Sequence, residues 1–154
     1  MKDHLIGVIS DTHGLLRPEA AGALRRSEMI LHAGDIGRPE VLEQLERTAP
    51  VRAVRGNNDR GDWAAGIPET LTITAGGLKI YMLHDLKTID VDPKAMAVDV
   101  IIAGHSHKPL VEDRDGVLYL NPGSAGPRRF KLPVTLAHLL IRSGKPEAKI
   151  VELI

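Results

Sequence analysis

The chain has 154 residues, no cysteine, and 20 basic residues balanced by 20 acidic ones. This length suits one domain over residues 1–154, and 43% hydrophobic residues are typical of a globular protein. Balanced charge and 3% aromatic residues disfavour polymeric nucleic acid as a partner, and the lack of cysteine excludes thiolate metal sites. No apolar run approaches the roughly 20 residues that cross a membrane, so we expect a cytoplasmic protein.

The first third of the chain alternates strand-like and helix-like segments. Short apolar runs at 5–10, 29–32 and 51–54 predict three buried strands. The segments 18–26 and 39–47 each begin with Pro-Glu and have the composition of helices. Strands that alternate with helices predict a parallel sheet with right-handed crossovers.

The sequence of the remaining two-thirds of the chain predicts antiparallel pairs of strands. Glycine-containing turns separate three pairs of strand-like segments: 70–73 with 78–83, 110–112 with 117–120, and 134–141 with 148–153. One further buried strand is expected at 98–103. Hairpins that follow parallel units predict an α/β fold with mixed or doubled sheets.

Seven side chains able to bind metal ions follow the predicted strands, at or just beyond their carboxyl ends. They are Asp11, His13, Asp35, Asn57, His84, His105 and His107. Loops beyond the carboxyl ends of parallel strands share one crevice, so we expect these side chains to converge. Glycine precedes three of them, Asp35, Asn57 and His105, where the backbone must turn and approach the site closely.

The number of donors indicates two metal ions. Four imidazoles, two carboxylates and one amide exceed the ligands of a single tetrahedral zinc site. Asp11 with His13, and His105 with His107, are two residues apart, a spacing that in extended backbone directs both side chains to one side. A carboxylate such as Asp35 can bridge two cations about 3.5–4 Å apart, which clamp a phosphate and activate a water. Nitrogen and oxygen donors suit manganese, iron, zinc or nickel.

The order of these motifs resembles the calcineurin-like metallophosphoesterase superfamily. The matching motifs are Asp11-x-His13, Gly34-Asp35, Gly56-Asn57-Asn58-Asp59, His84 and Gly104-His105-Ser106-His107. The short length, Val54-Arg55-Gly56-Asn57 and Leu120-Asn121-Pro122-Gly123-Ser124 look most like the small bacterial and archaeal phosphodiesterases of that superfamily.

The resemblance implies a fold, a ligand set and an activity. The fold is a four-layer α-β-β-α sandwich with two mixed β-sheets. One metal is held by Asp11, His13 and His107, the other by Asn57, His84 and His105, and Asp35 bridges them. The implied reaction is hydrolysis of a small phosphodiester by a metal-bound hydroxide, with manganese as the expected metal. Small relatives often self-associate, so a homo-oligomer is also an expectation.

Two departures from the family pattern concern the chemistry. Many relatives have a histidine that protonates the leaving oxygen where this chain has Asn58, and asparagine is no general acid. We therefore expect slow turnover or a preference for good leaving groups, with Asp35, Asn58 and His84 as the candidate catalytic residues. After His84, relatives often have Gly and a second His, whereas this chain has Asp85 and Leu86.

Other interpretations stay open. A catalytically weak protein-binding scaffold, like the retromer sorting subunit related to this family, is the alternative to a phosphodiesterase, and a nuclease acting on short or cyclic nucleotides is a third.

His32 is expected to be structural or to support a ligand, and Asp59 to orient Asn57 or cap its loop. We interpret His4 and His138 as structural. Four arginines either bind phosphate or are solvated: Arg55, Arg60, Arg128 and Arg129.

Overall fold

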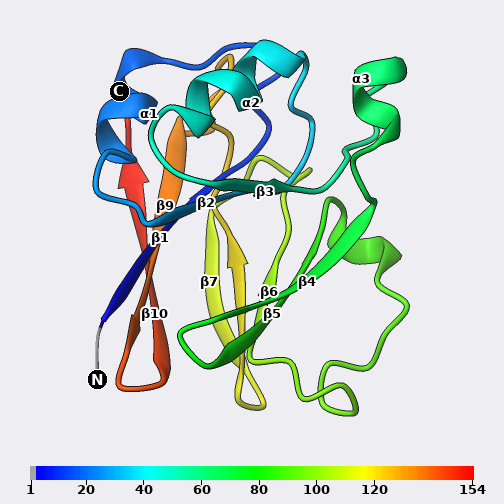
Figure 1. Cartoon of the computed structure of the whole chain (residues 1–154), viewed down its shortest axis with the longest axis vertical. Helices are drawn as coiled ribbons and strands as arrows, with labels where there is room; N and C mark the ends of the chain where they lie inside the picture. Colours follow the sequence, from blue (N-terminus) through cyan, green and yellow to red (C-terminus); the bar gives the residue numbers. More distant parts are fainter. Residues whose placement is uncertain (1–2) are drawn as a thin grey trace.

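Two five-stranded sheets pack against each other in the computed structural model, which describes residues 3–154 (Figure 1). The first two residues of the expected 1–154 domain lie outside the described residues. The strand order is β10-β9-β1-β2-β3 in the first sheet and β4-β5-β6-β8-β7 in the second. No helix in residues 3–154 is long and apolar enough to span a membrane.

The first sheet contains the parallel unit expected from the start of the chain. Strands β1 (His4–Ile9), β2 (Met29–His32) and β3 (Val51–Ala53) run parallel. Strand β9 (Thr135–Arg142) pairs antiparallel with β1, and β10 (Lys145–Glu152) pairs antiparallel with β9 at the edge. The sheet is therefore mixed, and the last two strands form the expected hairpin.

The second sheet has three parallel strands at its centre and an antiparallel strand at each edge. The centre is formed by β5 (Leu78–Leu83), β6 (Val100–Ile102) and β8 (Val117–Asn121). Strand β4 (Thr70–Ala75) pairs with β5, and β7 (Leu110–Arg114) pairs with β8. Both expected hairpins are present, and the prediction of two mixed sheets is confirmed.

Two helices cover the outer face of the first sheet. Helices α1 (Pro18–Ala23) and α2 (Pro39–Glu46) both begin with proline, whose fixed φ suits the first helical turn (Figure 1). Their apolar side chains pack on Ile9 and Ile30 of the sheet. Helix α1 is shorter than the predicted 18–26 because the chain turns there, with the Ser27 N–H bonded to the Leu24 carbonyl, before it enters β2.

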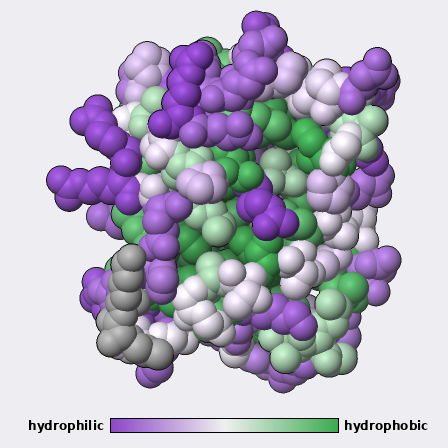
Figure 2. Space-filling view, in the orientation of Figure 1, coloured by the Kyte–Doolittle hydropathy of each residue, from purple (hydrophilic) through white to green (hydrophobic). Residues whose placement is uncertain are grey.

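Residues from both sheets fill the space between them. Strand β1 directs Ile6 and Val8 into this core, and β5 and β6 add Ile80, Met82 and Ile102, all at most 1% exposed. Strands buried on both faces explain the uninterrupted apolar runs of the sequence. In Figure 2, hydrophobic residues gather in the middle of the visible face and hydrophilic ones surround them.

The outer face of the second sheet has a thin cover. A single-turn 3₁₀ helix, η1 (Leu86–Thr88), and the irregular chain up to residue 98 place Leu86, Ile89 and Met96 over Tyr81 and Leu83. The remaining helix, α3 (Asp62–Ala65), lies between β3 and β4 in the chain. The four-layer order is thus present, with a 3₁₀ turn and loop as its fourth layer.

Candidate metal centre

Within each sheet, backbone hydrogen bonds join neighbouring loops at the carboxyl ends of the strands. The Asp11 N–H donates to the Gly34 carbonyl at 3.0 Å, and the His13 N–H to the Asp35 carbonyl at 2.9 Å. The Gly104 N–H donates to the His84 carbonyl at 2.9 Å. Because backbone groups fix these loops, the side chains that they bear converge.

The first cluster contains Asp11, His13 and His107. Asp11 is fully buried, and its Oδ1 lies 3.3 Å from His107 Nε2 and 3.8 Å from His13 Nε2. The other oxygen, Oδ2, accepts hydrogen bonds from Ser10 Oγ at 2.6 Å and from the His105 N–H at 3.1 Å. Asp11 is therefore oriented through Oδ2 and presents Oδ1 to the two imidazoles.

The second cluster contains Asp35, His84 and His105. His84 Nε2 lies 3.2 Å from Asp35 Oδ2 and 3.3 Å from His105 Nδ1. Nδ1 of His84 donates to the Ala33 carbonyl at 2.7 Å. A carbonyl accepts only, so the proton is on Nδ1 and Nε2 is the nitrogen available to a metal.

Asp35 lies between the two clusters. Its Oδ2 is 3.8 Å from His13 Nε2 of the first cluster and 3.2 Å from His84 Nε2 of the second. Asn58 fixes this carboxylate, because its backbone N–H donates to Oδ1 at 2.9 Å and its side-chain amide donates to Oδ2 at 3.2 Å. Asp35 therefore faces one imidazole of each cluster.

The seventh candidate ligand, Asn57, is exposed on the wall of a cavity of about 370 Å³. The same cavity is lined by His84 and His105 of the second cluster. The structure thus brings six of the seven predicted donors into two clusters and places Asn57 beside the second.

The backbone at the ligand positions differs from the expected extended conformation. Five candidate ligands have positive φ: Asp11 (55°), His13 (46°), Asp35 (54°), His105 (70°) and His107 (63°). Left-handed backbone is uncommon for residues other than glycine and is concentrated at functional sites, where surrounding structure enforces it. The expectation that both histidine-containing pairs use extended backbone was therefore wrong, because tight turns place these side chains.

The glycines before the ligands are required by close approach. A Cβ at Gly104 would overlap Ser10 Oγ and lie 2.6 Å from Asp11 Oδ2, and a Cβ at Gly56 would overlap Asp35. Any larger residue would push a candidate ligand out of place.

Unpartnered buried atoms show that the site fits a cation. Among the described residues, Asp11 Oδ1 and His13 Nε2 are buried without a hydrogen-bond partner, although they lie only 3.8 Å apart. Buried polar atoms normally have partners, and an exception calls for an explanation such as an ion. A divalent metal of the kind that takes imidazole and carboxylate ligands would satisfy both atoms.

The carboxylates are held in the ionised form that binds metals. Burial raises the pKa of Asp35, but the His84 imidazole 3.2 Å away and the hydrogen bond from the Asn58 N–H outweigh it and lower the pKa to about 2. The pKa of Asp11 is also lowered, since the nearby His107 imidazole and the hydrogen bond from Ser10 outweigh its burial. The pKa of His84 is raised, because the Asp35 and Asp11 carboxylates outweigh its burial.

Two buried residues near the site have structural roles. Asp59 accepts from the N–H groups of Ile36, Gly37 and Gly56 at 3.2, 3.0 and 2.9 Å, so it caps and joins two ligand-bearing loops. His32 accepts from the Gly34 N–H at 3.1 Å and contacts Thr12 Oγ1 at 3.0 Å. Burial lowers the pKa of His32 to about 4, so this imidazole is neutral.

Sequence reasoning missed several supporting residues. Asn121 donates to the Gly104 carbonyl at 3.0 Å, and Ser124 donates to the Asp11 carbonyl at 3.0 Å, so the Asn-Pro-Gly-Ser turn braces the ligand loops with its side chains. Ser10 fixes Asp11. Asn121 and Ser124 belong to a segment that carries the family resemblance, and Ser10 directly precedes Asp11, but neither signal predicted these hydrogen bonds.

The remaining candidates are outside the two clusters. Arg55 pairs with Glu69 at 2.7 Å and lines the polar cavity, while Arg60, Arg128 and Arg129 are exposed. Asp85 Oδ2 lies 3.8 Å from His105 Nε2, and its other oxygen accepts from the Lys87 N–H at the start of η1. His4 bonds to Glu28 and His138 to the Ala23 carbonyl, as structural residues do.

Two mixed sheets thus carry two clusters of histidine and carboxylate side chains beyond their strand ends. The calcineurin-like phosphoesterase superfamily domain matches residues 5–144, and the chain belongs to that superfamily.

The chain is similar to two archaeal proteins. A probable metallophosphoesterase of Methanothermobacter thermautotrophicus is 35% identical, over 96% of this chain and 91% of that protein. A phosphodiesterase of Methanocaldococcus jannaschii is 30% identical, over 77% of this chain and 82% of that protein. Among solved structures, Vacuolar Protein Sorting 29 of Cryptosporidium parvum superposes with a TM-score of 0.78 and 21% identity over 97% of each chain, a likeness of fold alone.

Proposed function

We propose that the chain hydrolyses small phosphodiesters with a dinuclear metal centre. The observation that carries this proposal is the position of Asp35 between two clusters of candidate ligands, with Asp11 Oδ1 and His13 Nε2 unpartnered beside it among the described residues. The similarity to a phosphodiesterase supports the choice of a diester. Because both sheets contribute ligands, residues 1–154 act as one catalytic domain.

The proposed ligands of the first metal are Asp11, His13 and His107, and those of the second are Asn57, His84 and His105, with Asp35 shared. When bound, two divalent cations supply positive charge to the phosphate oxygens and lower the pKa of the attacking water. Manganese is the proposed metal, and iron, zinc and nickel suit the same donors.

The chain's own residues position and polarise this site. Asn58 holds Asp35 through two hydrogen bonds, and Ser10 holds Asp11 through one. The ionised carboxylates attract the cations, since the pKa values of Asp11 and Asp35 are lowered. Asn58 cannot protonate a leaving oxygen, so we propose that turnover favours esters whose alcohols leave without a general acid.

The test compares bis-p-nitrophenyl phosphate with p-nitrophenyl phosphate, using metal-stripped protein with and without manganese. We expect manganese-dependent release that favours the diester. Asp35→Asn should abolish most of it, whereas Asp99→Asn, which changes a half-buried carboxylate at the start of β6, should not. Unchanged turnover in Asp35→Asn would contradict the proposed mechanism.

The alternative is a protein-binding scaffold with little catalysis. It is favoured by the amide of Asn58 at the general-acid position and by the fold shared with Vacuolar Protein Sorting 29. A stoichiometric partner in a pull-down, together with no turnover of either ester by the metal-loaded protein, would support it. Faster cleavage of a labelled oligonucleotide than of small diesters would instead indicate a nuclease.

A further inference from the structure

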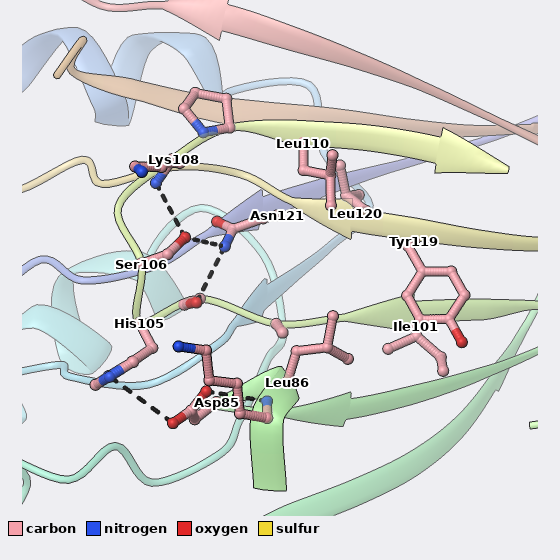
Figure 3. Close-up of a pocket in the computed structure, with 14 residues that line it drawn as sticks. Asp85, Leu86, Ile101, His105, Ser106, Lys108, Leu110, Tyr119, Leu120 and Asn121 are labelled. Atoms are coloured by element: carbon pink, nitrogen blue, oxygen red, sulfur yellow. Dashed lines mark hydrogen bonds and ion pairs between the residues drawn. The ribbon is translucent and has the colours of Figure 1, made fainter. Parts of the chain in front are cut away.

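A cavity of about 640 Å³ lies on the outer face of the second sheet, beside the candidate metal centre. The cover formed by η1 and the chain up to residue 98 packs over β5 and β6, which leaves this face open toward β8 and β7. Ile101, Leu110 and Tyr119 of β6, β7 and β8 line the cavity, and Leu86 of η1 lines it as well (Figure 3).

The interior of this cavity is apolar and its mouth is charged. Ile101 and Leu120 are buried, whereas Lys87 and Lys108 are exposed at the rim together with the half-exposed Asp85. Two lysines against one aspartate leave a positive mouth, which favours an anionic ligand over a neutral apolar one.

The apolar cavity and the metal centre meet at His105. Figure 3 shows His105 and Asp85 toward one end of the cavity and Ile101 and Tyr119 toward the other. His105 and Asp85 also line the polar cavity that contains Asn57. A phosphate held at the metal centre would therefore have an apolar chamber on one side and a polar one on the other.

We propose that the apolar cavity binds one ester group of the substrate, so that the preferred substrates are phosphoesters with a large apolar group, aryl or alkyl. This inference rests on the proposed function. Size and concavity favour a small molecule, since such sites measure about 300–1,000 Å³ and are mostly apolar with a few polar groups. A protein partner would need about 800 Å² of surface on this side.

The test measures the dissociation constants of methylphosphonate and phenylphosphonate on the manganese-loaded protein by calorimetry. Both compounds offer the same anionic group to the metals, and only the phenyl ring can fill the apolar cavity. Transfer of a ring out of water predicts about tenfold or tighter binding of phenylphosphonate.

Two variants test whether the cavity causes the preference for phenylphosphonate. Leu110→Asn and Leu86→Asn keep the side-chain size but make the wall polar, so each should cut the preference to about threefold or less and leave methylphosphonate binding unchanged. Val111→Asn is the matched control, because Val111 is exposed on the same strand and does not line the cavity.

Equal affinities in the wild-type protein, binding of neither compound, or a preference that survives both cavity variants would overturn the inference. So would a dimer, seen by sedimentation, that Leu110→Asn dissociates, since a second copy would then occupy the cavity. If the wild-type protein prefers phenylphosphonate and the cavity variants lose this preference, the apolar binding site is supported. If the same wild-type protein hydrolyses no diester, the proposed hydrolysis is rejected and the binding site remains.

Discussion

The two carboxylate oxygens of Asp11 have different partners. Oδ2 accepts from Ser10 Oγ and the His105 N–H, while Oδ1 has no hydrogen-bond partner among the described residues and faces His107 Nε2 at 3.3 Å. One oxygen fixes the side chain, and the other is free to bind the proposed metal. The orientation of the ligand thus depends on a neighbouring serine.

Ser10→Ala should weaken metal binding. The change removes a short hydrogen bond that orients Asp11, and loss of such support lowers metal affinity about 10- to 100-fold. Titration of the metal-free protein with manganese measures the effect. Ser27→Ala is the control, because the buried Ser27 Oγ has no partner among the described residues. Equal manganese affinity in Ser10→Ala and wild type would show that Ser10 does not orient the ligand.

Neutral His32 makes stability depend on pH. The unfolded chain protonates this imidazole below a pKa of 6.5, whereas burial lowers the pKa in the folded protein to about 4. The unfolded state therefore binds more protons between these values, and the free energy of unfolding falls as pH is lowered from 6.5 to 4, by up to about 3 kcal/mol.

Urea unfolding of the metal-free protein at pH 7 and pH 5 measures this dependence. His32→Gln lacks the titrating group, so its stability should fall less over that interval than that of the wild type. His84, whose raised pKa acts with the opposite sign, is present in both proteins, so the difference between them reports mainly on His32. Equal pH dependence in the two proteins would contradict the role of His32.

The loops that follow the strands form the site, and their backbones approach one another closely. Gly104 is the clearest case, since a Cβ there would meet Ser10 and Asp11. Gly104→Ala should therefore displace Asp11, lower diester turnover at least about tenfold and destabilise the protein by about 1–3 kcal/mol.

Gly22→Ala in α1 is the matched control for Gly104→Ala. Apart from Gly22 itself, its two chain neighbours and the nearby backbone of its helix, no atom lies within 4 Å of a Cβ built at Gly22, and alanine in a helix is more stable than glycine by about 0.5–1 kcal/mol. Thermal unfolding and diester turnover of both variants give the comparison. Wild-type activity in Gly104→Ala would show that the loops tolerate a wider spacing.

The sequence predicted the strands and the convergence of their loops, because apolar runs and strand-end polar residues follow general rules of sheet packing. It did not predict the left-handed backbone at Asp11 and His105, which is imposed by contacts between distant loops. The hydrogen bonds from Asn58 to Asp35 were also missed, since they join loops 23 residues apart in sequence. How much of the outer face of the second sheet stays uncovered depends on how the chain after β5 packs, and hydrophobic periodicity does not predict that packing.

In the whole molecule, the hydrophobic core between the sheets and the candidate metal site consist of different residues. The core between the sheets consists of apolar residues such as Ile6, Ile80 and Ile102 and contains none of the candidate ligands. The protein should therefore stay folded when its metals are removed.

Chelation should leave the far-ultraviolet circular dichroism spectrum unchanged and lower the thermal midpoint. Ligand binding to the native state adds about 2.7 kcal/mol of stability at a hundredfold excess over the dissociation constant of one site. Asp35→Asn, which removes a shared ligand, should show a smaller manganese-dependent rise than wild type. Loss of the spectrum on chelation would mean that the metals hold the fold together.

The proposed dinuclear centre requires two metal ions that share Asp35. The most direct measurement is the anomalous diffraction of manganese-loaded crystals, collected near the manganese absorption edge. We expect two peaks about 3.5–4 Å apart, one beside Asp11, His13 and His107, the other beside His84 and His105, with the Asp35 carboxylate between them. A single peak, or none in crystals of active protein, would contradict it.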